Sequence, residues 1–228
     1  MIAEIKTEKI EDLLFYETKP ILELKLEYPQ VFGNIHGNCE NKFNSYYLKA
    51  AERTNLYLRT ELYKKAVITY KSSLKTGFPF DFMIFEKTFK ETLNNHYFIS
   101  IYFDTFKFEG GAHGLTTRKA ETWNINMGGI VNLGSFFVKG FNYGKFICDE
   151  ISKNIKNDLE NPESVYYKNA PERCKRLFDE RRYYLSDTGF IFFFPSYSIA
   201  PYYAGIRTFE VPFTEFGDKL KFIPNKTI

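Results

Sequence analysis

Residues that could carry out acid–base or metal chemistry are sparse in this chain of 228 residues. The three histidines, His36, His96 and His113, have no second histidine or acidic pair at the spacing of metal ligands, so we predict no metal and no cofactor. Ser196 and Ser198 lack the Gly-x-Ser-x-Gly turn that exposes a nucleophilic hydroxyl, which argues against a serine hydrolase. The remaining candidates lie in two unusual loops.

The first, called the glycine loop below, consists of Gly110, Gly111, Ala112, His113 and Gly114 between two expected strands. Its glycines permit positive φ angles and close approach of other groups to the backbone. No Lys-Ser/Thr pair follows and no helix is expected to begin there, so it is not a phosphate-binding loop. Two interpretations remain open: a ligand-facing role for His113, or a structural turn in which its imidazole bonds to nearby backbone.

The second is the Tyr-Pro loop, residues 197–205, with the sequence YSIAPYYAG. Tyrosines combine apolar area with a hydroxyl group, and proline limits the freedom of the loop, a combination that suits recognition. The candidate ligand-binding residues are Tyr197, Ala200, Pro201, Tyr202 and Gly205. The alternative is that the tyrosines pack over a sheet edge and Gly205 only turns the chain into the last strand.

Composition limits the class of protein and of partner. A net charge of +3, spread evenly along the chain, does not predict a nucleic-acid partner. Three cysteines without a Cys-x-x-Cys pair predict reduced, buried thiols. No stretch approaches the ~20 apolar residues of a membrane span. As written, the chain is expected to be cytoplasmic; a trimmed piece of a longer protein would be extracytoplasmic. The sequence does not predict an oligomeric state.

An aromatic content of 19% favours β-structure. Apolar and charged residues alternate over 22–28, predicting a strand that Pro29 ends, and 5–16 predicts its hairpin partner. From residue 41 to about 74 the period lengthens to three and four residues, which predicts a long amphipathic helix. We expect this helix to cover one face of a second hairpin, 83–93 and 97–103.

Further elements are a strand over 118–126, helices over 142–160 and from about Pro171, and strands over 190–194 and 209–213. Hairpins and helices are segregated, which predicts an α+β fold: a mainly antiparallel sheet with a long N-terminal helix and a second helix packed on it. The chain is interpreted as two modules, 1–108 and 109–228, within one compact unit.

Together, GGAHG followed by a strand and Leu-Gly-Ser-Phe-Phe at 133–137, and YSIAPYYAG before a final Val-Pro-Phe strand, give the chain a family resemblance over nearly its whole length. It resembles a bacterial domain family of uncharacterised activity, similar to the extracytoplasmic half of lysozyme-responsive anti-sigma factors and to the N-terminal region of some peptidoglycan deacetylases. The resemblance implies an α+β fold, no assigned catalytic centre, and a site formed by the two loops. In the anti-sigma members, the domain is a receptor that grips lysozyme.

Three functions remain open. The leading hypothesis is a non-enzymatic binding module that uses both loops as one recognition surface for a protein or cell-wall-derived ligand. The first alternative is a hydrolase acting on envelope glycan or peptide, with Glu109 and His113 as its acid–base pair; the second is a cytoplasmic structural interaction protein. An enzyme needs these side chains to converge in a concave pocket, whereas a binding module can present them on an open rim.

Overall fold

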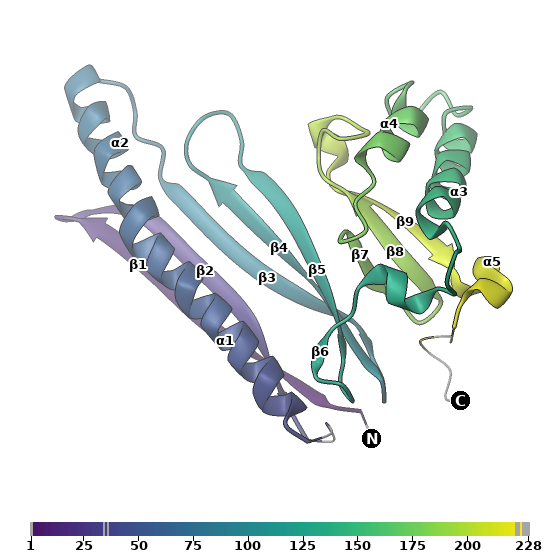
Figure 1. Ribbon diagram of the computed structural model, residues 1–228. Coiled ribbons are helices and arrows are strands. Elements are labelled where there is room, and N and C mark those ends of the chain that lie inside the picture. The colour runs from purple at the N-terminus through teal and green to yellow at the C-terminus, as the bar shows by residue number, and fades with distance from the viewer. Residues whose placement is uncertain (1, 34, 36, 222–223, 225–228) are drawn as a thin grey trace. The chain divides into compact units, whose positions relative to one another are not determined.

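The computed structural model describes residues 2–33, 35, 37–221 and 224, and it divides into two compact units (Figure 1). The helix unit contains the described residues of 3–89 and 103–116. The aromatic unit contains Ile2, 90–102 and the described residues from 117 onward. His36, one of the three histidines considered above, lies outside the described residues.

The described residues form a six-stranded sheet and a separate three-stranded sheet. The strands of the larger sheet follow chain order: β1 (Glu4–Tyr16), β2 (Lys19–Phe32), β3 (Met83–Asn94), β4 (Phe98–Phe108), β5 (Leu115–Asn124) and β6 (Gly129–Ile130). β1 and β2 pair antiparallel, whereas β2 and β3 pair parallel, because the long helix connects them. β3, β4 and β5 each contribute residues to both units. The predicted mainly antiparallel α+β class is confirmed.

The sequence predicted that Pro29 ends the second strand. This prediction is wrong, because β2 continues to Phe32. On one side of this extension the chain still pairs with β1, with Pro29 opposite Thr7. On the other side, the Asn44 side chain accepts a hydrogen bond from the Val31 N–H (2.8 Å) and donates one to the Val31 carbonyl (2.9 Å). Backbone groups alternate direction along a strand, so those of residue 29 point to the same side as those of residue 31, toward Asn44 and away from β1. The proline therefore lacks an N–H only where no hydrogen bond to β1 would form.

The long helix follows two strands and is therefore not N-terminal, which corrects the sequence-based prediction. It comprises α1 (Cys39–Tyr57), a π-helical turn (Leu58–Leu62) and α2 (Tyr63–Thr76), and it packs on β2. Its buried side chains recur mostly at four-residue steps: Cys39, Phe43, Tyr47, Ala51, Leu58, Leu62 and Ala66. On an α-helix, each four-residue step rotates the side-chain direction by roughly 40° around the helix axis. The wider π turn partly reverses this rotation, which keeps the buried side chains on one face.

The helix covers the sheet within its own unit, since the Tyr47 ring lies 5.4 Å from that of Phe103 on β4. Leu58 and Leu62 join Leu22 and Leu24 of β2 in an aliphatic core. Tyr57, the last residue of α1, is exposed. None of the helices among the described residues is both long and apolar enough to cross a membrane.

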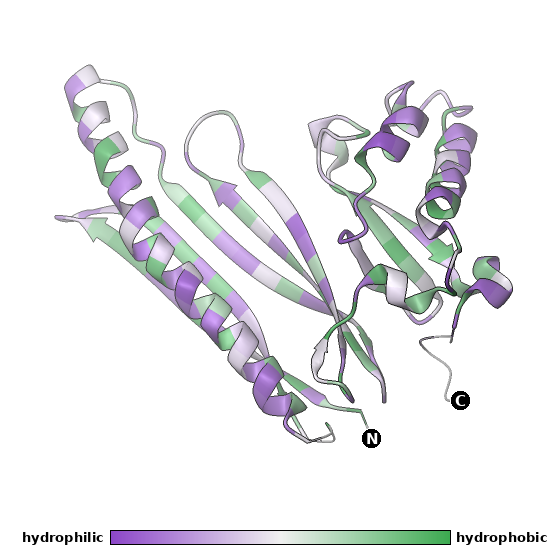
Figure 2. Cartoon of the chain, viewed as in Figure 1, coloured by the Kyte–Doolittle hydropathy of each residue, from purple (hydrophilic) through white to green (hydrophobic). Residues whose placement is uncertain are grey.

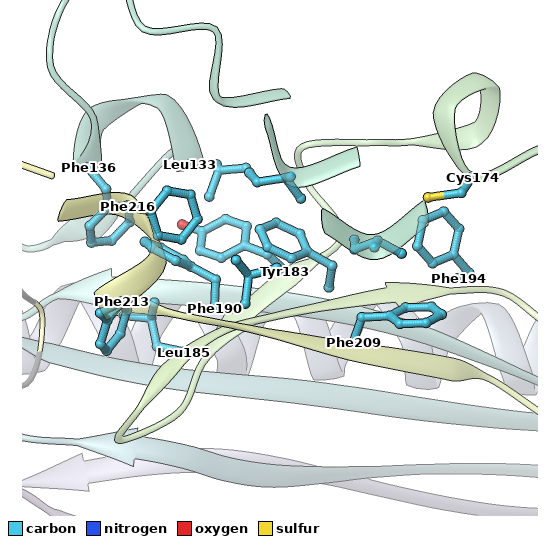
Figure 3. Close-up of a cluster of buried hydrophobic side chains, with 14 of the residues drawn as sticks. Leu133, Phe136, Cys174, Tyr183, Leu185, Phe190, Phe194, Phe209, Phe213 and Phe216 are labelled. Atoms are coloured by element: carbon cyan, nitrogen blue, oxygen red, sulfur yellow. The ribbon is translucent and has the colours of Figure 1, made fainter. Parts of the chain in front are cut away.

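The aromatic unit places helices α3 (Tyr143–Asp158), α4 (Ala170–Leu177) and α5 (Phe213–Phe216) with strands β7 (Tyr183–Leu185), β8 (Gly189–Phe194) and β9 (Arg207–Pro212). The predicted second helix, α3, packs against α4 and β9. β8 is hydrophobic along its length, whereas the long helix alternates between hydrophilic and hydrophobic residues (Figure 2). Figure 3 shows the resulting core, in which aromatic rings such as Phe136, Phe190 and Phe216 pack together.

Candidate functional site

The glycine loop connects β4 and β5 in the helix unit. Gly110 and Gly111 have φ angles of 98° and 96°, a region that side-chain-bearing residues rarely adopt. The Gly111 N–H donates a 2.9 Å hydrogen bond to the Asp81 carboxylate, which also lies against Gly110. The turn is thus held from outside by one acidic side chain that the sequence analysis did not single out.

Gly114 is required by packing. It is buried, and a Cβ atom there would lie 2.3 Å from the Phe106 ring and 2.8 Å from the Lys107 carbonyl oxygen. No side chain can occupy that space unless the strand or the ring moves. All three glycines of the loop therefore have a structural explanation within the helix unit.

His113 and Glu109, the pair considered for acid–base chemistry, have separate neighbours. His113 is exposed, and its Nδ1 lies 3.1 Å from the Gly114 carbonyl oxygen. The Glu109 carboxylate is ion-paired with Lys65 of α2. Among the described residues, no group of three or more His, Cys, Asp and Glu side chains is arranged to hold a metal ion.

The Tyr-Pro loop connects β8 and β9 in the aromatic unit. Tyr197 adopts a φ of 66°, one of two positive values found for non-glycine residues among those described, and its side chain is 47% exposed. The Arg173 guanidinium donates to the Tyr197 carbonyl (3.1 Å), and the next N–H, of Ser198, donates to the Pro195 carbonyl (3.1 Å). These bonds hold the backbone in a conformation that tyrosine itself disfavours.

The middle of the loop is anchored and its end is exposed. Ile199 and Ala200 are buried, and the Ile199 carbonyl accepts a 3.0 Å bond from the N–H of Tyr167. Pro201 leads into a 3₁₀ turn (Tyr202–Ala204), and Gly205, with a φ of 66°, turns the chain toward β9. Ala200, predicted as a ligand contact, is only 2% exposed and is placed as part of this anchor.

What we call the tyrosine surface consists of two exposed tyrosines, Tyr197 and Tyr203, and the half-buried Tyr202. The rings of Tyr197 and Tyr202 lie 5.5 Å apart, and Tyr203 is 77% exposed. Arg173 borders this surface and stacks over Tyr167 at 4.9 Å. Sequence reasoning missed Arg173 because its importance depends on the contact between α4 and a loop 24 residues away.

The two loops belong to different units. The structure brings the glycine loop to Asp81 and Phe106, and the Tyr-Pro loop to Arg173 and Tyr167. The combination of both loops in one recognition surface stays a prediction.

Cavities are found in both units. One of about 640 Å³ borders the β1–β2 hairpin and includes Phe80 and Phe82. A second, of about 550 Å³, lies in the aromatic unit beside β5 and includes Arg118 and Tyr183. Neither His113 nor Glu109 lines these two cavities.

Comparison with protein families gives two matches, each covering one of the two loops. Residues 16–116 match a model described as deacetylase PdaC, and residues 134–214 match one described as a protein of unknown function, DUF3298. The matches support a resemblance to a bacterial family of unknown function. No curated protein matches the chain.

Two solved structures share the fold. A DUF3298 family member from Bacteroides fragilis has a TM-score of 0.74 and 15% sequence identity, covering 97% of this chain and 95% of its own. A DUF3298 family protein from Pseudomonas aeruginosa has a TM-score of 0.62 and 15% identity, covering 97% and 96%. At this level of identity the likeness concerns the fold alone.

Proposed function

We propose that the chain is a non-enzymatic binding module that recognises a protein or cell-wall-derived ligand, with the tyrosine surface as its principal contact. The observation that carries the proposal is Tyr197, held at a positive φ with its ring exposed. A non-glycine residue in this region costs of order 1–3 kcal/mol and persists only where the surrounding structure imposes it. A glycine at this position would fold with less strain, so the presence of a tyrosine supports a role for its side chain.

The neighbouring residues support the same role. Tyr203 exposes most of its side chain, although a buried position would stabilise the fold more. Tyrosine has few rotatable bonds, so ordering it on binding costs little entropy, and its ring and hydroxyl offer both apolar contact and a hydrogen bond. Pro201 restricts the backbone before the 3₁₀ turn, which lowers that cost further.

The alternative of a hydrolase finds less support. The Glu109 carboxylate is engaged by the Lys65 ammonium, and its histidine neighbour lies on an exposed turn. General acid–base catalysis needs a proton donor and acceptor that face one substrate position in a water-excluding site.

The resemblance to peptidoglycan deacetylases and lysozyme-responsive anti-sigma factors indicates which ligands to test first. We would measure retention of the purified chain on insoluble peptidoglycan and on lysozyme-coupled resin. Pro201→Ala and Tyr203→Ala are expected to weaken retention on one of these about tenfold, which corresponds to about 1.4 kcal/mol, the loss expected for an interface residue that contributes clearly to binding. Phe78→Ala is the matched control, because Phe78 is a similarly exposed aromatic residue (75%) in the helix unit.

Melting temperatures should stay close to the parent value in all three variants. Equal retention of Tyr203→Ala and the parent, an equal loss in Phe78→Ala, or no retention of the parent on either ligand would contradict the proposal.

The glycine loop is proposed as a further contact, tested separately through its exposed His113. His113→Ala should reduce retention on the same ligand without lowering thermal stability, because the side chain is exposed. A variant that binds as the parent does would remove the glycine loop from the site and leave the tyrosine surface unaffected.

A further inference from the structure

The Tyr-Pro loop itself carries no charge, whereas two arginines lie at its margins. Residues 195–206 contain no Asp, Glu, Lys, Arg or His. Arg173 of α4 bonds to the Tyr197 carbonyl, and Arg207 begins β9 directly after this segment. Both arginines are half-buried. They place two positive charges beside the tyrosine surface.

The Arg173 guanidinium is held in place without being neutralised. Its Nη2 donates to the Tyr197 carbonyl oxygen, and its plane lies over the Tyr167 ring. Its Nε is buried and has no hydrogen-bond partner, and Arg173 forms no ion pair with a described residue. A hydrogen bond to a carbonyl needs no positive charge, and a partly buried charge without a partner costs free energy. The fold alone therefore does not explain an ionised side chain at this position.

Arg207 shows the same arrangement at the other margin of the loop. Its Nε (3.3 Å) and Nη2 (3.1 Å) both donate to the Tyr166 hydroxyl, and its guanidinium carbon lies 5.1 Å from the centre of the Tyr166 ring. The acceptor is again neutral, and Arg207 forms no ion pair within the described part of the chain. Stacking on a ring orients a guanidinium but leaves its charge in place.

Two more exposed arginines of the same chain do have acidic partners. Arg59 pairs with Asp12 (2.7 Å) and Arg181 with Asp179 (2.9 Å). An ion pair gains more free energy as its surroundings become less polar, so half-buried arginines benefit more from a carboxylate than exposed ones do. The chain supplies carboxylates where they matter less, which indicates that the negative charge for Arg173 comes from a ligand.

We propose that the ligand of the tyrosine surface is an acidic protein segment whose Asp or Glu carboxylate binds Arg173 beside Tyr197; this inference rests on the function proposed above. The Nη1 nitrogen and the second N–H of Nη2 are the donors left for the carboxylate, and they form the end of the guanidinium that matches its two oxygens. Arg207 adds attraction for a second acidic group. Tyrosine and arginine are the residue types that dominate protein interfaces, which favours a protein over a glycan.

A random dodecapeptide library displayed on phage tests the charge preference without assuming a ligand sequence. Selection on the immobilised full chain should enrich Asp and Glu, relative to the starting library, among peptides that Tyr203→Ala no longer binds. The strongest such peptide is then compared with a counterpart that carries Asn and Gln in place of Asp and Glu. The counterpart should bind at least about tenfold more weakly, because the charge-assisted hydrogen bonds are lost.

Two variants assign the preference to one arginine. Arg173→Gln should weaken binding of the acidic peptide about tenfold and bring it close to that of the Asn/Gln counterpart. Arg176→Gln is the matched control, because it removes the same charge from an exposed position of the same helix. Arg176 lines a cavity that includes no residue of the Tyr-Pro loop, so binding should stay unchanged.

Equal binding of the two peptides, an equal loss in the two arginine variants, or Tyr203-dependent peptides without acidic enrichment would overturn the inference and leave the tyrosine surface in place. Retention on peptidoglycan without any Tyr203-dependent peptide would also overturn it, because the ligand would then not be a protein. The peptide comparison uses the unaltered chain, so it decides the matter even if Arg173→Gln folds poorly. Loss of the Tyr203 effect in every assay would instead remove the proposed function, and this inference with it.

Discussion

The glycine loop and the Tyr-Pro loop contrast in what their residues do for the fold. In the glycine loop, each glycine answers a local requirement: a positive φ at Gly110 and Gly111, and the Phe106 ring at Gly114. In the Tyr-Pro loop, Tyr197 occupies a position where glycine would cost less, and Tyr203 contributes little buried area. An unusual composition alone does not separate structural loops from functional ones. A residue that its backbone conformation or packing requires indicates a structural role, whereas a residue that strains or does not stabilise the fold indicates a functional one.

The cores that hold these loops differ as well. Within the helix unit, a core of mainly aliphatic side chains from β2 and the long helix includes Leu22, Leu24 and Leu58. The core of the aromatic unit is built largely from phenylalanine rings, with Phe190 at 5.1 to 5.6 Å from four others. Rings have fewer rotamers than long aliphatic chains and prefer edge-on contacts, so this core gives the Tyr-Pro loop a firmly positioned base.

The largest expected effect is in the aromatic core. Phe190→Ala should lower the free energy of unfolding by about 3–5 kcal/mol, because truncation removes a fully buried ring and leaves a cavity. The free energy of unfolding can be measured by urea denaturation monitored through tryptophan fluorescence, since Trp123 lies in the same unit. Tyr203→Ala, on the exposed surface, should change the value by less than about 0.5 kcal/mol. Similar losses in both variants would contradict the separation of core and surface.

A smaller effect tests the glycine loop. Gly114→Ala should destabilise the protein by about 1–3 kcal/mol, the cost of overpacking, because the new methyl group meets the Phe106 ring. Gly129→Ala is the control: a Cβ atom there would have no neighbour within 4 Å, and the φ of Gly129 is not positive. If thermal denaturation gave both variants parental stability, the packing explanation for Gly114 would be wrong.

The strain at Tyr197 can be isolated by comparing two variants. Tyr197→Ala and Tyr197→Gly both lose the ring contact with Tyr202, but only glycine relieves the left-handed backbone. The glycine variant should be more stable than the alanine variant by about 0.5–1 kcal/mol, after the greater freedom of unfolded glycine is subtracted. Both should bind ligand poorly. A more stable alanine variant would remove the argument from strain.

The smallest effect concerns Asp149 of α3, which forms ion pairs with Lys145 of the same helix and with Lys175 of α4. Hydrogen bonds from Lys145 and Lys175 lower the pKa of Asp149 from 3.8 to about 2. A folded-state pKa below the unfolded one stabilises the fold above the unfolded pKa, and this contribution is lost as the pH falls toward 2. Carboxyl NMR should place the Asp149 titration near pH 2, and Asp149→Asn should show a shallower acid-induced loss of stability. A titration near 3.8 would contradict these contacts.

Much of the fold could be predicted because its elements carry strong periodicity. The alternation of Leu22, Leu24 and Leu26 predicts a half-buried strand, and the four-residue steps from Ile147 to Ile155 predict α3. β7 was missed because its three residues, Tyr183–Leu185, are all buried and show no alternation. Pro29 was misread because the hydrogen bonds that replace a neighbouring strand come from a helix that follows it.

The candidate site was predictable only as residue types. The glycines and tyrosines are conspicuous in the sequence, but Asp81 and Arg173, which bond to the backbone of these loops, lie 30 and 24 residues away from the groups they contact. Phe106 lies on the strand before the glycine loop and meets Gly114 only once the chain has turned back. The burial of individual loop residues was not predictable either. Neither the burial of Ala200 nor the exposure of Tyr203 follows from the local sequence. Such information resides in tertiary contacts.

The Asn44 amide has a consequence for how the protein behaves in a crowded solution. An open strand edge is a template on which another chain can add, and one route to aggregation starts there. By satisfying both backbone groups of Val31, this single side chain leaves neither of them open to an added strand, at the end of β2 that extends beyond its pairing with β3. At this point of the sheet, protection against strand addition thus comes from one helical asparagine that takes no part in the hydrophobic core.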